Sequence, residues 1–435
     1  MTGTIKKASF KQYFALQGDK ALWIIFFVLS AVSLIEVYSA ASALALKNGI
    51  MGTVFGHFKF LMIGFFVAWI FHNIPCRLFK YGVAAWLILI VLLVFLPLFG
   101  EKVNDGARWI NIMGIKFQPS EFAKGTLIII VSIILSSYQS AKSADHHAFK
   151  YIMWLTCITC GLIFLENAST AIILFTTVAA MMIFGRVPRK QLGILAGVIA
   201  LLACAGITLI SVLPMHRIIE AAPALHRLDN FVARIDRFSD SKEDKYASSK
   251  DSVVAKWHFD IKEEPQVGHA NIAIAKSNII GCGPGNSKER DFLPQAYSDF
   301  IFAIIIEELG LLGGAAVVFL YIILLFRASR IANQCERNFP AFLVLGLAML
   351  ITLQALVNMS VAVGLIPVTG QPLPLISRGG SSIIATSMYF GMMISVSRFA
   401  KKRADLGAKK SQASKEPQTE SLINVEEYAS DKGIK

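Results

Sequence analysis

The sequence predicts an all-α integral membrane protein, with about ten transmembrane helices and a large extracytoplasmic loop between the seventh and the eighth helix. Two observations support this fold class. First, 55% of the 435 residues are hydrophobic and only 16% are charged, whereas about a quarter of the residues of a soluble protein are charged. Second, long apolar runs alternate with short polar connectors, which is typical of a chain that crosses a bilayer repeatedly.

Ten apolar runs define the predicted spans, and most of them approach the roughly 20 residues that a helix needs to cross a bilayer. They comprise residues 21–46, 54–72, 81–99, 121–138, 151–166, 169–185, 191–213, 299–327, 340–362 and 381–398. The first span follows a lysine-rich start and is too long for a signal-peptide core, so we expect a retained signal anchor. The fifth and sixth spans are separated only by Glu166 and Asn167, and their combined length favours two helices over one interrupted region.

Basic residues predict the orientation of the spans. Lysine and arginine concentrate in the connectors on one side, which the positive-inside rule places in the cytoplasm together with both termini. This topology divides the chain into an N-terminal tail (1–20), a membrane domain (21–398) that includes the outer loop (about 214–298), and a C-terminal tail (399–435) of disordered composition. The outer loop carries 12 basic and 12 acidic residues, and a loop of this length is expected to be partly ordered.

Composition also excludes some classes of function. The net charge of +13 arises mainly from the connectors and tails, so it indicates membrane topology rather than binding to nucleic acid. Cys157 and Cys160 form a CxxC pair inside an apolar run, which favours packing over a redox or zinc site. No spacing of ligand residues indicates a metal or another cofactor, and a divalent cation stays an open alternative.

The first of three polar clusters lies at the outer ends of the third and fourth spans. It contains Arg108 and the segment 118–124, in which Pro119 suits the first turn of a helix and Glu121 favours its positive end. Glu121 and Lys124 are three residues apart and share a helix face, so they can form an ion pair. Spacing alone favours a structural pair over a catalytic role.

The second cluster contains the glycine-rich segment 281–287, which includes Asn286, and then Asp299, where a polar loop becomes an apolar helix. A partly desolvated carboxylate at this position can act as a general base. A helix N-cap is the more frequent explanation for such a residue. Glu307 and Glu308 lie about two turns deeper and need partners such as a cation or an arginine.

The third cluster, residues 367–382, is a stretch rich in proline and glycine between the ninth and tenth spans. Irregular backbone at membrane depth is tolerated only against protein or a wet cavity. We therefore expect a re-entrant loop that lines a cavity, with a plain outer loop as the alternative.

These clusters contain five pieces in a fixed order: GARWI, QPSEFAK, GNS, LPQAYSDFIFAIIIEELG and PLPLISRGGSS. The ordered set resembles the SEDS family of bacterial cell-wall polymerases, whose members include FtsW, RodA and SpoVE, over about residues 20 to 398. The ISRGGSS stretch and the tail beyond Arg398 are closer to the division member, FtsW, than to RodA. The chain departs from the family pattern in the segment 166–170, which replaces Gln-Pro-Asp-Leu-Gly-Thr, and at Arg378, which replaces a tyrosine.

The resemblance implies a ten-helix peptidoglycan glycosyltransferase of the bacterial inner membrane, which polymerises lipid II for septal wall synthesis and releases undecaprenyl diphosphate. It implies Asp299 as the catalytic residue, and a class B penicillin-binding protein and other division proteins as partners. The substrate-binding residues that it implies are Arg108, Gln118, Glu121, Lys124, Asn286, Ser377, Gly379, Gly380 and Ser381.

The chemistry of these residues agrees with such roles. Asp299 can take the proton from an acceptor sugar hydroxyl, and Arg108 and Lys124 are suitable cations for the leaving lipid pyrophosphate. A single candidate carboxylate predicts inversion at the anomeric carbon, because retention usually needs a second carboxylate close by. Glu121 keeps retention open.

Three other functions stand beside this one. An elongation polymerase of the RodA type would use the same residues. A lipid II flippase would hold the pyrophosphate with the same cations, but it needs a cavity that reaches the cytoplasmic side, and few charges other than Glu36, Glu307 and Glu308 lie deep in the spans. A scaffold that recruits division proteins would be favoured by an unchanged phenotype of an Asp299→Ala variant.

Overall fold

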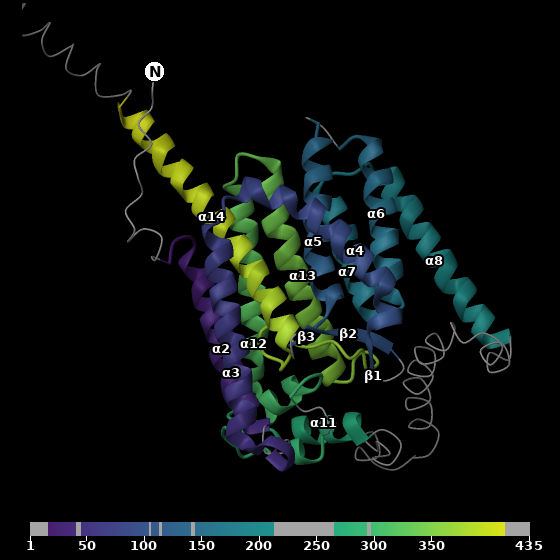
Figure 1. Cartoon of the computed structure of the whole chain (residues 1–435), viewed down its shortest axis with the longest axis vertical. Coiled ribbons are helices and arrows are strands. Elements are labelled where there is room, and N and C mark those ends of the chain that lie inside the picture. The colour runs from purple at the N-terminus through teal and green to yellow at the C-terminus, as the bar shows by residue number, and fades with distance from the viewer. Residues whose placement is uncertain are drawn as a thin grey trace, which may run out of the picture.

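The computed structural model describes residues 16–40, 45–103, 106–112, 115–140, 144–212, 265–293 and 297–413. The chain forms a bundle of long helices with short strands at one end (Figure 1). Ten helices correspond to the ten predicted spans: α2 (Lys20–Ala40), α3 (Ala45–Asn73), α4 (Gly82–Phe99), α5 (Pro119–Ser137), α6 (His146–Phe164), α7 (Ala168–Phe184), α8 (Arg189–Val212), α12 (Ile301–Asn333), α13 (Asn338–Ala362) and α14 (Gly380–Ala413). Within the described residues, eight helices are long and apolar enough to cross a membrane, and α7 is a shorter apolar helix. The predicted fold class, an all-α protein with membrane-spanning helices, is confirmed.

Some boundaries differ from the predicted ones. α2 ends at Ala40 rather than near residue 46, and α14 continues to Ala413, so the first part of the predicted C-terminal tail is helical. The described part of the outer loop contains α11 (Pro265–Lys276) and the short 3-10 helix η5 (Glu289–Asp291). Residues 1–15, 213–264 and 414–435, which hold much of the predicted tails and outer loop, lie outside the described residues.

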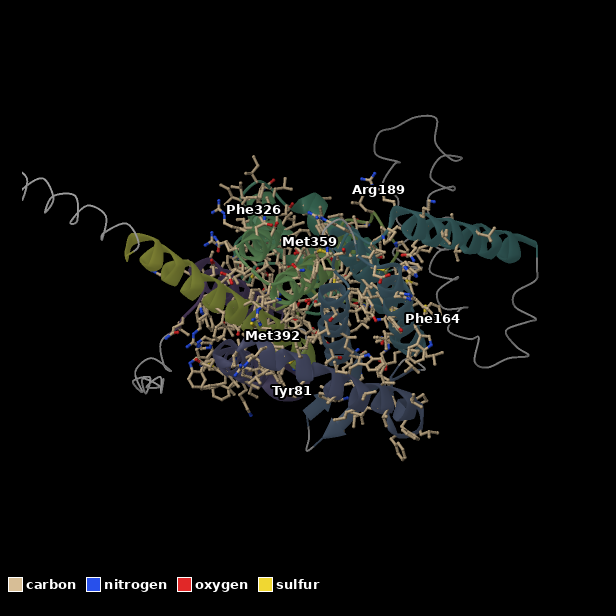
Figure 2. The ribbon with its side chains drawn as sticks, turned by 90° about the horizontal axis from the view of Figure 1, so that it is seen from above. Tyr81, Phe164, Arg189, Phe326, Met359 and Met392 are labelled. Atoms are coloured by element: carbon tan, nitrogen blue, oxygen red, sulfur yellow. The ribbon has the colours of Figure 1, made fainter. Side chains whose placement is uncertain are left out.

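Three helices, α5, α13 and α14, are the most buried of the candidate spans and form the centre of the bundle. α13 packs against α5, α7, α12 and α14. In the view from above, Met359 of α13 and Met392 of α14 lie within the bundle, whereas Tyr81, Phe164 and Phe326 lie nearer its edge (Figure 2). Large exposed apolar side chains on the outer helices form the kind of surface that a bilayer covers.

A small antiparallel sheet, which the sequence did not predict, lies between α4 and α5. Its strands are β1 (Glu101–Val103), β2 (Gly106–Ile112) and β3 (Ile115–Phe117), in the order β1-β2-β3. Ile110 of β2 pairs with Phe117 of β3, and the Phe117 ring stacks on Phe122 of α5 at a centroid distance of 4.8 Å. The sheet therefore connects Arg108 on β2 rigidly to the first turn of α5.

The predicted continuous span 299–327 is interrupted at Gly310, where α12 breaks with a φ of +72°. The free backbone groups at the break bind a segment of the outer loop. The Cys282 and Gly283 amides donate to the Glu307 and Glu308 carbonyls (3.0 and 2.8 Å), and the amides of residues 311 and 312 donate to the carbonyls of residues 278 and 279 (both 3.2 Å). A Cβ at Gly310 would lie 2.3 Å from the carbonyl oxygen of residue 279, so only glycine fits this approach.

The predicted basic connectors lie at one end of the bundle, and the strands and α11 lie at the other (Figure 1). At the basic end, Arg327 of α12 binds Asp19, which precedes α2, at 2.6 Å. The Asp19 amide also donates to Ser397 of α14 (2.9 Å). This separation agrees with the predicted topology, and which end faces the cytoplasm stays a prediction.

Candidate functional site

Residues 367–379, between α13 and α14, form a loop that we call the buried loop, because Leu373, Leu375, Ile376 and Ser377 are all at most 2% exposed. It is attached to the segment that precedes α12. Ser377 Oγ donates to the Ser298 carbonyl (2.6 Å), and the Arg378 amide donates to the Tyr297 carbonyl (2.9 Å). The expected re-entrant loop is thus packed against protein at the end of α12 that carries Asp299. Leu375 has a φ of +64°, a conformation that is rare for a bulky side chain and that clusters at functional sites.

Asp299 is half-buried at the start of α12. Its Oδ1 accepts a hydrogen bond from Ser298 Oγ (2.9 Å), and its main-chain carbonyl accepts one from Asn358 Nδ2 of α13 (2.9 Å). The same amide nitrogen donates to the carbonyl of Gln371 in the buried loop (2.7 Å). At Gly370 the buried loop turns with a φ of +66°, and a Cβ there would lie 3.7 Å from Asp299 Oδ2. Asn358 therefore connects the backbone of Asp299 to the backbone of the buried loop.

Glu121 and Lys124 form the predicted ion pair within α5, at 2.8 Å and almost fully buried. Lys124 Nζ also donates to Gln354 Oε1 of α13 (3.1 Å), and Gln354 Nε2 donates to the Pro372 carbonyl of the buried loop (3.2 Å). Both Glu121 and Lys124 are thus linked to the loop that lies beside Asp299. The ammonium of Lys124 is occupied by two oxygen partners in this arrangement.

The start of α7 brings a third polar segment to this region. Asn167 is the N-cap of α7, and its side chain accepts hydrogen bonds from the amides of Ser169 and Thr170. Gln371 Nε2 of the buried loop donates to Thr170 Oγ1 (2.7 Å), and Arg108 Nε of β2 donates to the Glu166 carbonyl (3.0 Å). The segment 166–170, where the sequence departs from the family pattern, therefore contacts both Arg108 and the buried loop.

Other predicted site residues lie around the buried loop. Gln118 is the N-cap of α5, and its side chain donates to Ser120 (3.2 Å). Gly379 precedes α14 and Gly380 begins it, and a Cβ at Gly380 would lie 2.7 Å from the Phe60 ring of α3. Ser381, in the first turn of α14, is buried at 2% exposure.

Asn286 is placed apart from this group. It lies on the segment 281–290, where its side chain binds the Cys282 carbonyl (3.0 Å). The amides of Gly285 and Ser287 bind the carboxylate of Glu308 (3.0 and 3.2 Å). Glu308 is nine residues after Asp299, which corresponds to about 13 Å along a helix at its usual rise per residue.

The two deep carboxylates on α12 have the partners that the sequence required. Glu308 lies 3.7 Å from Arg290 Nη1 and accepts from Ser39 of α2, while Glu307 accepts from Ser287 Oγ and from the Lys288 amide (3.1 Å). They hold the outer segment onto α12. Glu36 of α2 is fully buried, and its oxygens have no hydrogen-bond partner among the described residues.

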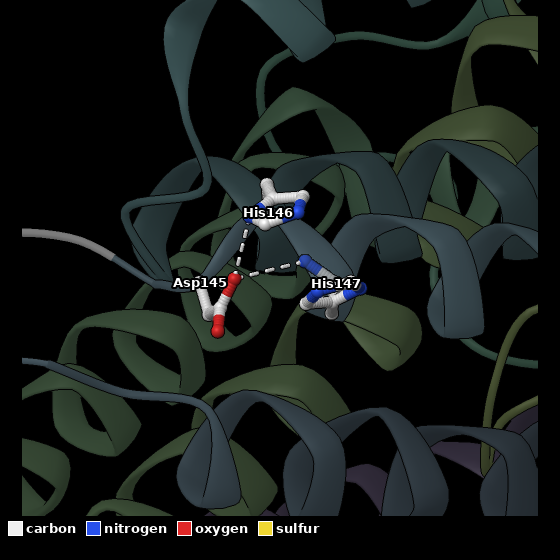
Figure 3. A group of neighbouring side chains, drawn as sticks. All are labelled: Asp145, His146 and His147. Carbon is white, nitrogen blue, oxygen red and sulfur yellow. Dashed lines mark hydrogen bonds and ion pairs between the residues drawn. The ribbon is translucent and has the colours of Figure 1, made fainter.

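One group of side chains in the described part of the chain has the composition and spacing of a metal site. Asp145, His146 and His147 stand exposed at the start of α6, with ligand atoms within 4.8 Å of one another (Figure 3). Asp145 also has an ordinary structural role there, since it is the N-cap of α6 and accepts from the His147 amide (3.2 Å). The group lies at the end of the bundle opposite the strands, so it is not part of the site around Asp299.

Sequence reasoning missed four residues that join these pieces: Gln354, Asn358, Gln371 and Thr170. A signal for two of them was present. Gln354 and Asn358 are uncharged polar residues four apart in an apolar run, so they share one helix face. A polar face within a membrane helix indicates a partner inside the bundle.

A family model described as cell cycle protein, for FtsW, RodA and SpoVE, matches residues 19–402. A protein of Coxiella burnetii named "Probable peptidoglycan glycosyltransferase FtsW" is 28% identical over 386 residues, which cover 86% of this chain and 95% of the relative. A Haemophilus influenzae protein of the same name is 28% identical over 388 residues, covering 87% and 90%.

Solved structures share the fold. A chain from a peptidoglycan synthase complex, described as coordinating polymerization and crosslinking, superposes with a TM-score of 0.68 at 22% identity, over 89% of this chain and 99% of that one. The rod shape determining protein RodA of Thermus thermophilus superposes with a TM-score of 0.58 at 20% identity, over 88% and 97%.

Proposed function

This chain belongs to the FtsW/RodA/SpoVE family of cell cycle proteins and is a peptidoglycan glycosyltransferase, and we propose that it polymerises lipid II with Asp299 as the general base. The observation that carries this proposal is the placement of Asp299. Its carboxylate accepts from Ser298, its carbonyl is held by Asn358, and the buried loop turns beside it at Gly370. A half-buried carboxylate held from several elements has the fixed position that general-base catalysis needs.

In the proposed reaction, the Asp299 carboxylate takes the proton of an acceptor sugar hydroxyl. The hydroxyl oxygen forms a bond to the anomeric carbon of the donor, and the bond from that carbon to the diphosphate oxygen breaks. Undecaprenyl diphosphate leaves with the bonding electrons, so its negative charge needs a cation. Arg108 is the better candidate for this role, because it is only half-buried, whereas Lys124 is 1% exposed and is bound by both Glu121 and Gln354. Lys124 then acts by holding Gln354 and, through it, the buried loop.

Inversion at the anomeric carbon follows from the same arrangement. Retention would need a second carboxylate positioned as a nucleophile. Glu121, the alternative that the sequence left open, is 3% exposed and paired with Lys124, which favours a structural role for it. We infer direct displacement by the acceptor hydroxyl.

A role in septal wall synthesis, with a class B penicillin-binding protein as partner, is supported by two findings. Relatives that cover most of the chain carry the name FtsW, and a structural neighbour is part of a complex that couples polymerization to crosslinking. The basic connectors at one end of the bundle support a cytoplasmic location for both termini and an outer location for Asp299. The bilayer is then the bacterial inner membrane.

The test is glycan polymerisation from labelled lipid II by the purified protein with its cognate penicillin-binding protein. Wild type is compared with Asp299→Asn and with a matched control, Asp291→Asn, which removes an exposed carboxylate on η5. Polymer from wild type and from the control, with none from Asp299→Asn at equal folding, is the expected result. Polymer from Asp299→Asn would refute the general-base assignment. Wild type that moves lipid II across vesicles without making polymer would indicate a flippase.

A further inference from the structure

A cavity of about 500 Å³ lies at the basic end of the bundle, far from Asp299 along the helices. It is formed where the α3–α4 connector, the α12–α13 connector and α14 meet. The apolar part of its lining, which we call the apolar floor, includes Pro75, Pro340, Val396 and Phe399. Cavities of roughly 300–1,000 Å³ are the size that holds a small ligand or a headgroup. The catalytic proposal gives this cavity no role.

Two exposed arginines belong to the lining of the cavity. Arg77, after the end of α3, and Arg337, before the start of α13, both line it and are both exposed. Among the residues whose side chains the structure describes, neither guanidinium has an ion-pair partner. Glu336 also lines the cavity, so its charged lining has one positive charge in excess, and an anionic group placed between the arginines would meet favourable charge.

The surroundings add to this positive field. Lys80 Nζ lies 5.4 Å from the centre of the Phe339 ring in the first turn of α13, and Arg398 Nη1 donates to Asn73 at 3.1 Å. Arg337 is the N-cap of α13 and its side chain makes no capping hydrogen bond, so the positive end of this 25-residue helix is uncapped by a side chain. The cavity thus combines two guanidinium groups with an apolar floor.

The Cys335 thiol in the lining does not oppose an anion. Burial, and then the neighbouring Cys76, raise the pKa of the Cys335 thiol to about 11, so it is neutral at physiological pH. Cys335 also donates to the carbonyl of residue 331 at 3.3 Å. A neutral, apolar floor suits the glycerol and first methylene groups of a lipid better than it suits a free hydrated phosphate.

We propose that this cavity binds the headgroup of an anionic phospholipid, with the phosphate between Arg77 and Arg337 and the glycerol end on the apolar floor. The position of the cavity supports a lipid over a protein segment, because the cavity lies between the ends of membrane-spanning helices, where headgroups lie. Basic pockets between such helices are sites at which anionic headgroups bind. This proposal does not depend on the polymerase reaction.

The experiment is native mass spectrometry of the full-length protein released from detergent, with phosphatidylglycerol or phosphatidylcholine added in steps. Wild type is compared with the double variant Arg77→Gln/Arg337→Gln. The matched control is Arg189→Gln/Lys190→Gln, which removes two exposed charges near the same end, at the start of α8 and outside the cavity. A third variant, Ala400→Phe, fills the cavity without changing its charge. Melting temperatures check that each variant is folded.

The double variant is expected to lose about 25-fold in affinity for phosphatidylglycerol, at about fivefold per basic residue near an anionic surface. Ala400→Phe should also weaken it, the control should stay within about twofold of wild type, and phosphatidylcholine should bind weakly to all. Equal losses in the control and the double variant would overturn the proposal, since binding would then depend on overall charge. If glycerol phosphate competed for the cavity as strongly as the lipid does, the cavity would be assigned to a free phosphate. This result would also overturn the proposal.

Discussion

Replacing Lys124 with methionine keeps the length of the side chain but removes its charge. The ammonium now lies 2.8 Å from Glu121 Oε1 and 3.1 Å from Gln354 Oε1, and the Lys124 side chain is 1% exposed. In the Lys124→Met variant the Glu121 carboxylate stays buried, because α5 is among the most buried helices of the bundle. Among the described residues it then has no ion-pair partner, and the Gln354 oxygen loses the Lys124 donor.

The expected cost is large for a single substitution. Breaking a buried ion pair by removing one partner destabilises a protein by about 3–5 kcal/mol, because a buried charge is left uncompensated. Removing both charges, in Glu121→Gln/Lys124→Met, leaves no such charge, so the double variant should recover most of the loss. Lys150→Met, which removes an exposed lysine of α6, serves as the control and should cost less than about 1 kcal/mol.

The assay is thermal unfolding of the four proteins in the same lipid nanodiscs, with the melting temperature as the readout. The expected order, from most to least stable, is wild type together with the control, then the double variant, then Lys124→Met. Glycan polymerisation is measured in parallel, and the double variant should remain impaired because Lys124 no longer holds Gln354, which binds the buried loop through the Pro372 carbonyl. A single variant as stable as wild type, or a double variant no better than the single one, would refute the reasoning.

Three further predictions follow from the contacts. Asn358→Ala removes the donor of two carbonyls, that of half-buried Asp299 and that of buried Gln371. The buried carbonyl costs about 1–3 kcal/mol when it is left unpaired. The variant should lower the turnover number of polymerisation more than it changes the Michaelis constant, because it loosens the backbone of Asp299. Gly310→Ala should lower the yield and the melting temperature strongly, whereas Gly193→Ala, at an open position, should not. Burial disfavours the charged form of Glu289, but hydrogen bonds from Lys276 and His269 outweigh it and lower the pKa of Glu289 below the ordinary 4.5. The carboxylate therefore stabilises α11 at neutral pH, and this support is lost as the pH falls through the lowered pKa. Hydrogen exchange in α11, followed as the pH is lowered below 4.5, should show a loss of protection.

The spans were predictable from sequence because burial in a bilayer depends on local composition. A run of about 20 apolar residues must cross as a helix wherever it lies in the fold. The ion pair of Glu121 and Lys124 was equally local, since three residues separate its partners. Asp299 was identified by its position at a change from polar to apolar sequence, with the family resemblance to support it.

The links between these residues were not predictable in the same way. Lys124 and Gln354 are 230 positions apart, and Gln371 and Thr170 are 201 apart, so no local pattern joins them. The break at Gly310 was missed for a similar reason. A glycine in an apolar run is ordinary in a membrane helix, and only the approach of residues 278–283 makes it necessary.

The break in α12 also constrains how the chain enters the membrane. Two carbonyls and two amides at the break bind the segment that precedes the helix. Each such group left unpaired in hydrocarbon costs several kcal/mol, so α12 cannot settle in its final form until that segment has folded back onto it. In the predicted topology, residues 278–293 and 297–312 therefore form one unit of biogenesis, in which translocation of the outer loop must be complete before the helix that follows it matures.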